Sequence, residues 1–163
     1  MNNLKDLFCH QLKLLYCVEN RTIQYFPLII KKTSDFKLRY ALEVHLKETE
    51  THKKRLDHIC KSINFDKNNA ECLAITGLLD QVKEFMNRAN NDNVFNAGLI
   101  AEIQRVEHFE ICAYGTAVCY AKELGLQRIA GDLQETLNEE YNANDKLSLL
   151  AQVFINYKAV DCA

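Results

Sequence analysis

The chain contains one proline and five glycines in 163 residues, and no apolar run approaches the length of a membrane span. With so few helix-breaking residues, 48% hydrophobic residues and charges spread along its length, the chain is expected to fold as an all-α globular protein rather than stay disordered. A transmembrane helix needs roughly 20 apolar residues in a row, so a membrane is not an expected partner. The length predicts one domain over residues 1–163 with a substantial core.

A strong net charge is also missing, since the formal charge is −2 at pH 7. We therefore expect neither a nucleic acid nor an anionic membrane surface as a partner. The sequence has no glycine-rich phosphate loop, and its three serines lie in no nucleophile motif. The chemistry of the protein must come from other residue types.

The seven cysteines form no C-x-x-C pair, and their number is odd. The first ten residues, MNNLKDLFCH, include acidic and polar residues where a signal peptide would have an apolar core. We therefore expect a cytoplasmic protein whose cysteines are reduced thiols, used mostly as small buried hydrophobic residues.

Apolar residues spaced by three and four predict four long helices, near residues 3–32, 34–63, 92–124 and 127–158. Pro27 falls inside the first, which either continues with a kink or stops near Tyr25, and we prefer the continuous helix. Ser34 or Asp35 can cap the second helix, and Asp92 the third. Gly125 suits the left-handed residue that closes the third helix.

A shorter helix is predicted between the second and third long ones, from about residue 68 to 89. Asn68 followed by Glu71 resembles a capping box at its start. We interpret this helix as a connector across the bundle, because two parallel long helices cannot be joined by a tight turn.

Each of the four long helices carries polar groups in the middle of its apolar face. Buried carboxylates are costly unless a proton, a salt bridge or a metal cancels their charge. No comparable set of Lys or Arg shares these faces, which favours a metal. Di-iron and di-manganese bundles take one Glu from each of two helices and a Glu with a His from the other two. The predicted ligands are Glu19, Glu48, His52, Glu107, Glu110 and Glu140.

Each of these residues alone has an ordinary structural interpretation. A single Glu on such a face is more often a surface residue, and a lone His, such as His45 or His108, is more often structural. His52 follows Glu48 by four residues rather than three, and a second Glu-x-x-His motif is missing. The pattern on all four helices together predicts two metal ions, with iron as the expected metal and manganese or zinc as alternatives.

Five segments resemble the YciE/YciF family of ferritin-like bacterial stress proteins, and the similarity covers nearly the whole chain. They are LKDLFCHQLKLLYCVENRT, ALEVHLKETETHKKRLD, CLAITGLL, LIAEIQRVEHFEICAYGT and LQETLNEEYNANDKL. The resemblance implies a ferritin-like four-helix bundle, a rubrerythrin-type di-metal centre and a homodimer, with no settled enzymatic activity. It places the same six residues as ligands. Further candidates as ligands or as partners of ligands are Asn144, Asp145, Glu139, His108 and His45.

Three functions remain open from the sequence. The first is a di-metal oxidase or peroxidase of the stress response, which reacts with dioxygen or peroxide. The second is a non-catalytic dimeric stress protein with a vestigial or structural metal site. Iron storage is disfavoured, because the full ligand spacing of ferritin is missing. Tyr114, one turn past Glu110, has three interpretations: it hydrogen-bonds a ligand, carries an electron near an oxidised metal, or fills core volume.

Overall fold

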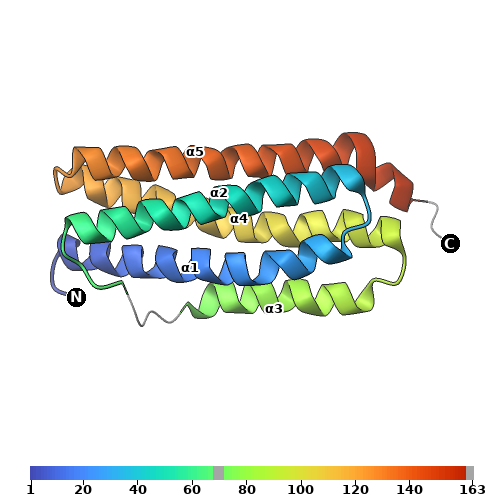
Figure 1. Ribbon diagram of the computed structural model, residues 1–163, viewed down its shortest axis with the longest axis horizontal. Helices are drawn as coiled ribbons and strands as arrows, with labels where there is room; N and C mark the ends of the chain where they lie inside the picture. The colour runs from blue at the N-terminus through green and yellow to red at the C-terminus, as the bar shows by residue number, and fades with distance from the viewer. Residues whose placement is uncertain (68–71, 161–163) are drawn as a thin grey trace.

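The computed structural model describes residues 1–67 and 72–160. The α-helices of this part of the chain are α1 (Leu4–Lys32), α2 (Phe36–Ser62), α3 (Leu73–Arg88), α4 (Asp92–Glu123) and α5 (Gln127–Leu150). The four long helices form a bundle, and the shorter α3 lies along its side against α1 and α4 (Figure 1). Helices α2 and α4 run in the same direction. The prediction of an all-helical bundle with a connecting helix is therefore confirmed.

The first two helices begin and end close to their predicted bounds. Helix α1 continues through Pro27 to Lys32, so the continuous helix is correct and the early stop is not. Of the two candidate caps for α2, Asp35 is the one used: its carboxylate accepts hydrogen bonds from the backbone N–H groups of Lys37 and Leu38, at 3.0 and 3.2 Å. Such a cap supplies partners for N–H groups that the first turn leaves free.

The starts of α3 and α4 differ from the predictions. Helix α3 begins at Leu73, and the proposed capping box of Asn68 and Glu71 lies outside the described residues. The prediction that Asp92 caps α4 is wrong by one position. The side chain of Asn91 accepts from the N–H groups of Asn93 and Val94, and Asp92 is the first helical residue. An acid there still suits the positive end of the helix dipole.

Two positions in the fold require a glycine, one for its backbone conformation and one for lack of space. Gly125 has φ +70° just after α4, which confirms its role in closing the helix. Gly98 lies where α4 meets α3, and a Cβ atom there would lie 2.2 Å from Cζ of Phe85. The close approach of these two helices therefore depends on the missing side chain.

The last helix was predicted to run unbroken to Lys158, and this is wrong beyond Leu150. The chain widens into a π-turn at Ala151–Ile155 and then tightens into a 3₁₀ turn at Asn156–Ala159. A π-turn holds one more residue than an α-turn, so it shifts the buried face by one position. Ile155 is fully buried, whereas Phe154, which an unbroken α-helix with three-four spacing would place in the core, is only partly covered.

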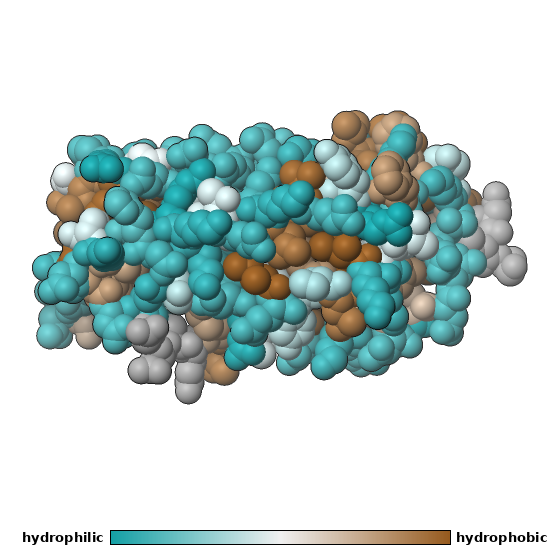
Figure 2. Space-filling view, viewed as in Figure 1, coloured by the Kyte–Doolittle hydropathy of each residue, from teal (hydrophilic) through white to brown (hydrophobic). Residues whose placement is uncertain are grey.

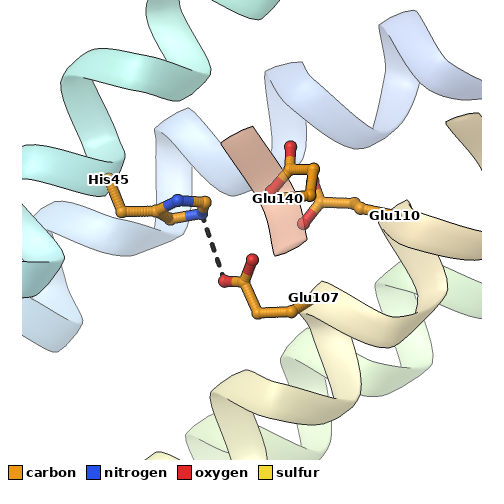
Figure 3. Close-up of side chains that lie close together, drawn as sticks. All are labelled: His45, Glu107, Glu110 and Glu140. Atoms are coloured by element: carbon orange, nitrogen blue, oxygen red, sulfur yellow. Dashed lines mark ion pairs between the residues drawn. The ribbon is translucent and has the colours of Figure 1, made fainter. Parts of the chain in front are cut away.

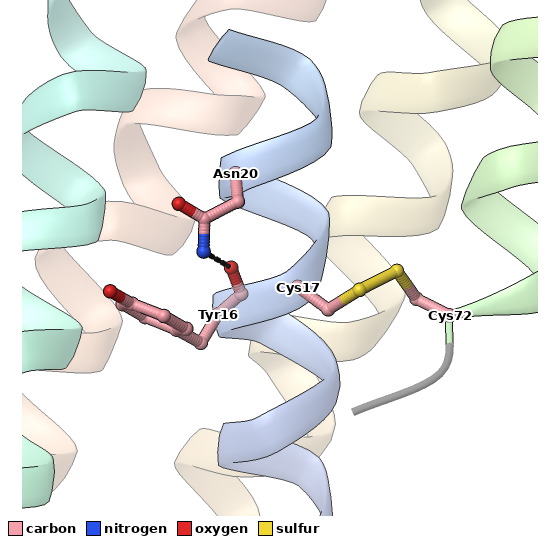
Figure 4. The surroundings of a disulfide bond; sticks show 4 residues. All are labelled: Tyr16, Cys17, Asn20 and Cys72. Carbon is pink, nitrogen blue, oxygen red and sulfur yellow. Dashed lines mark hydrogen bonds between the residues drawn. A yellow bond between two sulfur atoms is a disulfide. The ribbon is translucent and has the colours of Figure 1, made fainter. Parts of the chain in front are cut away.

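The expectation that all cysteines are reduced thiols is wrong. Cys17 on α1 forms a disulfide with Cys72, the residue just before α3 (Figure 4). The two Cα atoms are 6.1 Å apart, within the usual range for a disulfide. Residues 55 positions apart cannot be matched by local spacing, which is why the sequence pattern did not reveal the pair. Cys9, Cys60, Cys112 and Cys119 are free thiols, and Cys162 lies outside the described residues.

The core divides into two apolar clusters along the bundle. One includes Phe26, Ile29, Leu99 and Ile103, and the other includes Leu12, Leu15, Leu56 and Ala117. The stretch of the core between them is polar, and it contains the candidate site. None of the described helices is long and apolar enough to cross a membrane.

Candidate metal centre

Four helices bring acidic and histidine side chains together in the middle of the bundle. They come from α1, α2, α4 and α5, and each occupies a position where the three-four spacing would place an apolar residue. All are at most 5% exposed: Glu19, His45, His52, Glu107, Glu110 and Glu140. The apolar seams therefore converge on one polar cluster.

The cluster contains two groups that could each hold a metal ion. His45, Glu107, Glu110 and Glu140 form one, seen in Figure 3, and Glu19, His52 and Glu140 form the other. Within each group, one ligand atom per residue lies within 4.8 Å of the others. Glu140 belongs to both groups, and a carboxylate has two oxygens with which to bridge two cations. When ionised, the four carboxyl groups of the two sets would carry four negative charges, which two divalent cations would cancel.

Many polar atoms of this cluster have no hydrogen-bond partner. They include both carboxylate oxygens of Glu107 and of Glu140, and both ring nitrogens of His45. His45 Nε2 lies 3.2 Å from Glu107 Oε1, but the geometry is not that of a hydrogen bond. Buried polar atoms are rarely left without partners, because each costs about 1–3 kcal/mol. The donor set and its unpartnered atoms fit a metal centre.

Burial sets the protonation of most carboxyl groups in the metal-free cluster. Because burial disfavours the charged form, it raises the pKa of Glu19, Glu107 and Glu110 well above the ordinary value. Burial also lowers the pKa of His45, which keeps this imidazole neutral. Glu140 is the exception: burial alone would raise its pKa, but the neighbouring His52 and His45 lower it.

His52 lies between two glutamates of α5. Its Nδ1 is 3.0 Å from Glu140 Oε1, and its Nε2 is 3.0 Å from Glu139 Oε2. Burial alone would lower the pKa of His52, but Glu140, Glu19 and Glu139 together raise it to about 9. In the metal-free protein the imidazolium therefore supplies a positive charge among the carboxylates.

Four side chains position the cluster from outside it. Arg55 forms an ion pair with Glu139 through both terminal nitrogens, and Glu139 in turn contacts His52. Tyr114 donates a hydrogen bond to Glu19. Thr22 donates a 3.4 Å hydrogen bond to Glu110 Oε1. Such partners fix the orientation of metal ligands and raise their basicity.

The other predicted residues take different places. Glu48 is half-buried at the edge of the cluster, with Oε2 3.9 Å from His45 Nδ1 and Oε1 3.9 Å from Lys146 Nζ. Asn144 is partly covered and accepts a 3.1 Å hydrogen bond from Gln104. Asp145 and His108 are exposed. The structure thus places His45 in the cluster, whereas Glu48, Asp145 and His108 do not belong to the two groups.

The cluster approaches the surface between α2 and α5. A small cavity of about 10 Å³ there is lined by residues that include His45, Glu48, Glu107 and Lys146. This volume has room for about one water molecule. Only a very small molecule could reach the cluster by this route without movement of the side chains.

Two residues of the site were missed from the sequence. Arg55 follows His52 by three residues, so helical spacing could have placed it on the same side of α2. Its contact with Glu139 depends on how α2 packs on α5, which the sequence does not give. Thr22 is on the apolar face of α1, but a threonine there is ordinary core filling.

These features define the class of the protein as a helical bundle with a buried carboxylate–histidine cluster that could hold metal. The chain belongs to the family described as "Domain of unknown function (DUF892)", whose model matches residues 3–160. It is 35% identical over 160 residues to Protein YciF of Escherichia coli K12, covering 98% of this chain and 96% of the relative. The resemblance to the YciF family is therefore confirmed.

Solved structures show the same architecture. The crystal structure of the E. coli stress protein YciF matches with a TM-score of 0.91 and 34% identity, over 96% of this chain and 99% of that chain. YcfI from Rhodopseudomonas palustris matches with a TM-score of 0.88 and 34% identity, over 91% and 94%. XCC3681 from Xanthomonas campestris shares the fold, with a TM-score of 0.74 and 16% identity over 95% of each chain.

Proposed function

We propose that the protein is a ferritin-like di-metal carboxylate protein of the stress response that binds two iron ions and reacts with dioxygen or peroxide. The observation that carries this proposal is the set of buried, unpartnered ligand atoms contributed by four helices. The stress role is taken from the similarity to a relative described as a stress protein. The small cavity supports a small oxidant.

The residues have distinct roles in this proposal. His45, Glu107 and Glu110 would hold one ion, Glu19 and His52 would hold the other, and Glu140 would contribute an oxygen to each. When bound, a pair of ferrous ions supplies electrons for the reduction of a small oxidant.

Binding of a metal ion by Glu19, His52 and Glu140 requires His52 to lose a proton. His52 Nδ1 faces the carboxylates, so this nitrogen must be free to coordinate. The other nitrogen, Nε2, then carries the proton and donates to Glu139 Oε2, 3.0 Å away. Arg55 holds Glu139 in place for this contact.

A second candidate is a non-catalytic stress protein in which the metal stabilises the fold. The enclosure of the cluster favours it, since the small cavity leaves little space for a substrate. We also propose a homodimer, which sedimentation velocity would test.

One experiment distinguishes the oxidase or peroxidase from the non-catalytic stress protein. Metal-free protein is loaded anaerobically with ferrous iron, and oxidation is followed by absorbance after addition of air or hydrogen peroxide. Repeated oxidation of two irons per chain supports the oxidase or peroxidase. Bound iron that raises the melting temperature but is not oxidised supports the structural role. Glu107→Ala should lose the ion assigned to His45, Glu107 and Glu110, whereas the exposed Glu84→Ala, on α3, is the matched control. Unchanged metal content in Glu107→Ala would show that the site is misplaced.

A further inference from the structure

An apolar groove lies between the start of α2 and the end of α5, and we call it the α2–α5 groove. Its volume is about 460 Å³, and its apolar walls are Phe36, Tyr40 and Val44 from α2 with Leu149 and Leu150 from α5. Phe36, Tyr40 and Leu149 are 71%, 61% and 58% exposed. Figure 2 shows apolar surface over the end of the bundle where α2 begins and α5 ends. Pockets for small molecules typically measure roughly 300–1,000 Å³, so this groove has a suitable size.

The groove adjoins the small cavity that reaches the metal cluster. Ala41 and Lys146 line both, and the cavity also touches His45 and Glu107. The groove therefore lies directly outside the route by which a small molecule would approach the cluster. An apolar molecule bound in it would cover that route.

The charges of the groove have one sign. Its lining includes Lys37 and Lys146, and none of the described residues that line it is acidic. Lys37 Nζ lies 3.3 Å from the centre of the Phe154 ring. Lys146 is 55% exposed, and its 3.9 Å separation from Glu48 is at the limit of an ion pair. A weak surface pair of this kind leaves the ammonium group able to bind another anion.

We propose that the α2–α5 groove binds a medium-chain fatty-acid anion. The alkyl chain packs on the apolar walls, and the carboxylate pairs with a flanking lysine. Burial of the alkyl chain against the apolar walls stabilises such a complex. This site goes beyond the proposed function and does not require metal. The separate pocket beside α3, lined by Lys31, Lys32 and Lys83, has smaller apolar walls and does not adjoin the cluster.

Isothermal titration of the full chain with sodium decanoate, below its micelle threshold, tests this proposal. One decanoate should bind per chain, and decyltrimethylammonium should bind at least roughly tenfold more weakly because its charge is reversed. Tyr40→Glu places a negative charge in the groove and should weaken decanoate binding roughly tenfold or more, whereas Tyr40→Phe should bind like the wild type. Lys146→Gln should weaken binding, and the matched control Lys83→Gln should not.

Several results would overturn the proposal. One is equal binding of the anion and the cation, and another is wild-type affinity in a folded Tyr40→Glu variant. A third is a dimer in sedimentation that excludes decanoate and is dissociated by Tyr40→Glu, because a second copy would then occupy the groove. Failure of decanoate to bind, with iron binding intact, removes this site and leaves the metal centre. Decanoate binding without iron binding supports the groove and removes the metal proposal.

Discussion

The hydroxyl group of Tyr114 on α4 donates a hydrogen bond to the carboxylate of Glu19 on α1, and both side chains are fully buried. This contact joins two helices inside the polar part of the core. It also combines two of the three interpretations of Tyr114, which fills core volume and orients a candidate ligand at once.

Replacement Tyr114→Phe should destabilise the metal-free protein. The ring stays, but Glu19 loses its donor, and an unsatisfied buried acceptor costs about 1–3 kcal/mol. Urea unfolding monitored by circular dichroism measures the loss. Tyr157→Phe is the control, because Tyr157 is 63% exposed. Equal stability of the two variants would mean that the contact contributes nothing.

Arg55→Gln should weaken metal binding without touching a ligand. Arg55 holds Glu139, and Glu139 contacts His52, so the imidazole would lose its orientation. Loss of such a partner typically costs roughly 10–100-fold in metal affinity. Competition with a chelator gives the affinity. Arg88→Gln removes an exposed ion pair on α3 and should leave the affinity unchanged.

The metal-free protein should lose stability as the pH rises from about 6.5 to about 9. The pKa of His52 is raised from 6.5 to about 9, so its contribution is complete below pH 6.5 and is lost as the pH passes about 9. The raised pKa values of Glu19, Glu107 and Glu110 act with the same sign, because deprotonation of a buried carboxyl group is unfavourable. Glu140, with a lowered pKa, contributes a constant amount over this range.

The melting temperature as a function of pH checks this expectation. His52→Gln should flatten the part of the curve between about pH 6.5 and 9. A metal-free protein whose melting temperature rises with pH would contradict the assigned protonation states.

The disulfide between Cys17 and Cys72 should stabilise the fold. It closes a loop of 55 residues, for which loop-closure entropy predicts about 4 kcal/mol. Cys17→Ser should lower the free energy of unfolding, measured by urea denaturation, by about this amount. Cys112→Ser changes an exposed free thiol and should leave it unchanged. A non-reducing peptide map should contain the Cys17–Cys72 peptide. A map that contains only free thiols would contradict the disulfide between Cys17 and Cys72.

The fold was predictable because the apolar spacing is regular along all four long helices. Leu12, Leu56 and Leu133 lie on these apolar faces, and all three are buried. The errors occur where a single residue changes the register or the cap. The π-turn at Ala151–Ile155 and the choice of Asn91 over Asp92 depend on local backbone geometry, which spacing does not encode.

Much of the candidate site was also predictable, because buried acids stand out on apolar faces. The exception is α2, where His45, Glu48 and His52 share one side of the helix. Which of them enters the core depends on the rotation of α2 against α4 and α5. The structure turns His45 and His52 inward and leaves Glu48 near Lys146. The sequence could not distinguish these rotations.

The central claim is that two metal ions share Glu140. Anaerobic titration of metal-free protein with ferrous iron, with bound iron measured after gel filtration, tests it most directly. The account predicts two tightly bound ions per wild-type chain, loss of both in Glu140→Ala, and retention of both in Glu48→Gln. Iron binding by Glu140→Ala that equals the wild type, or no binding by the wild type, would contradict it.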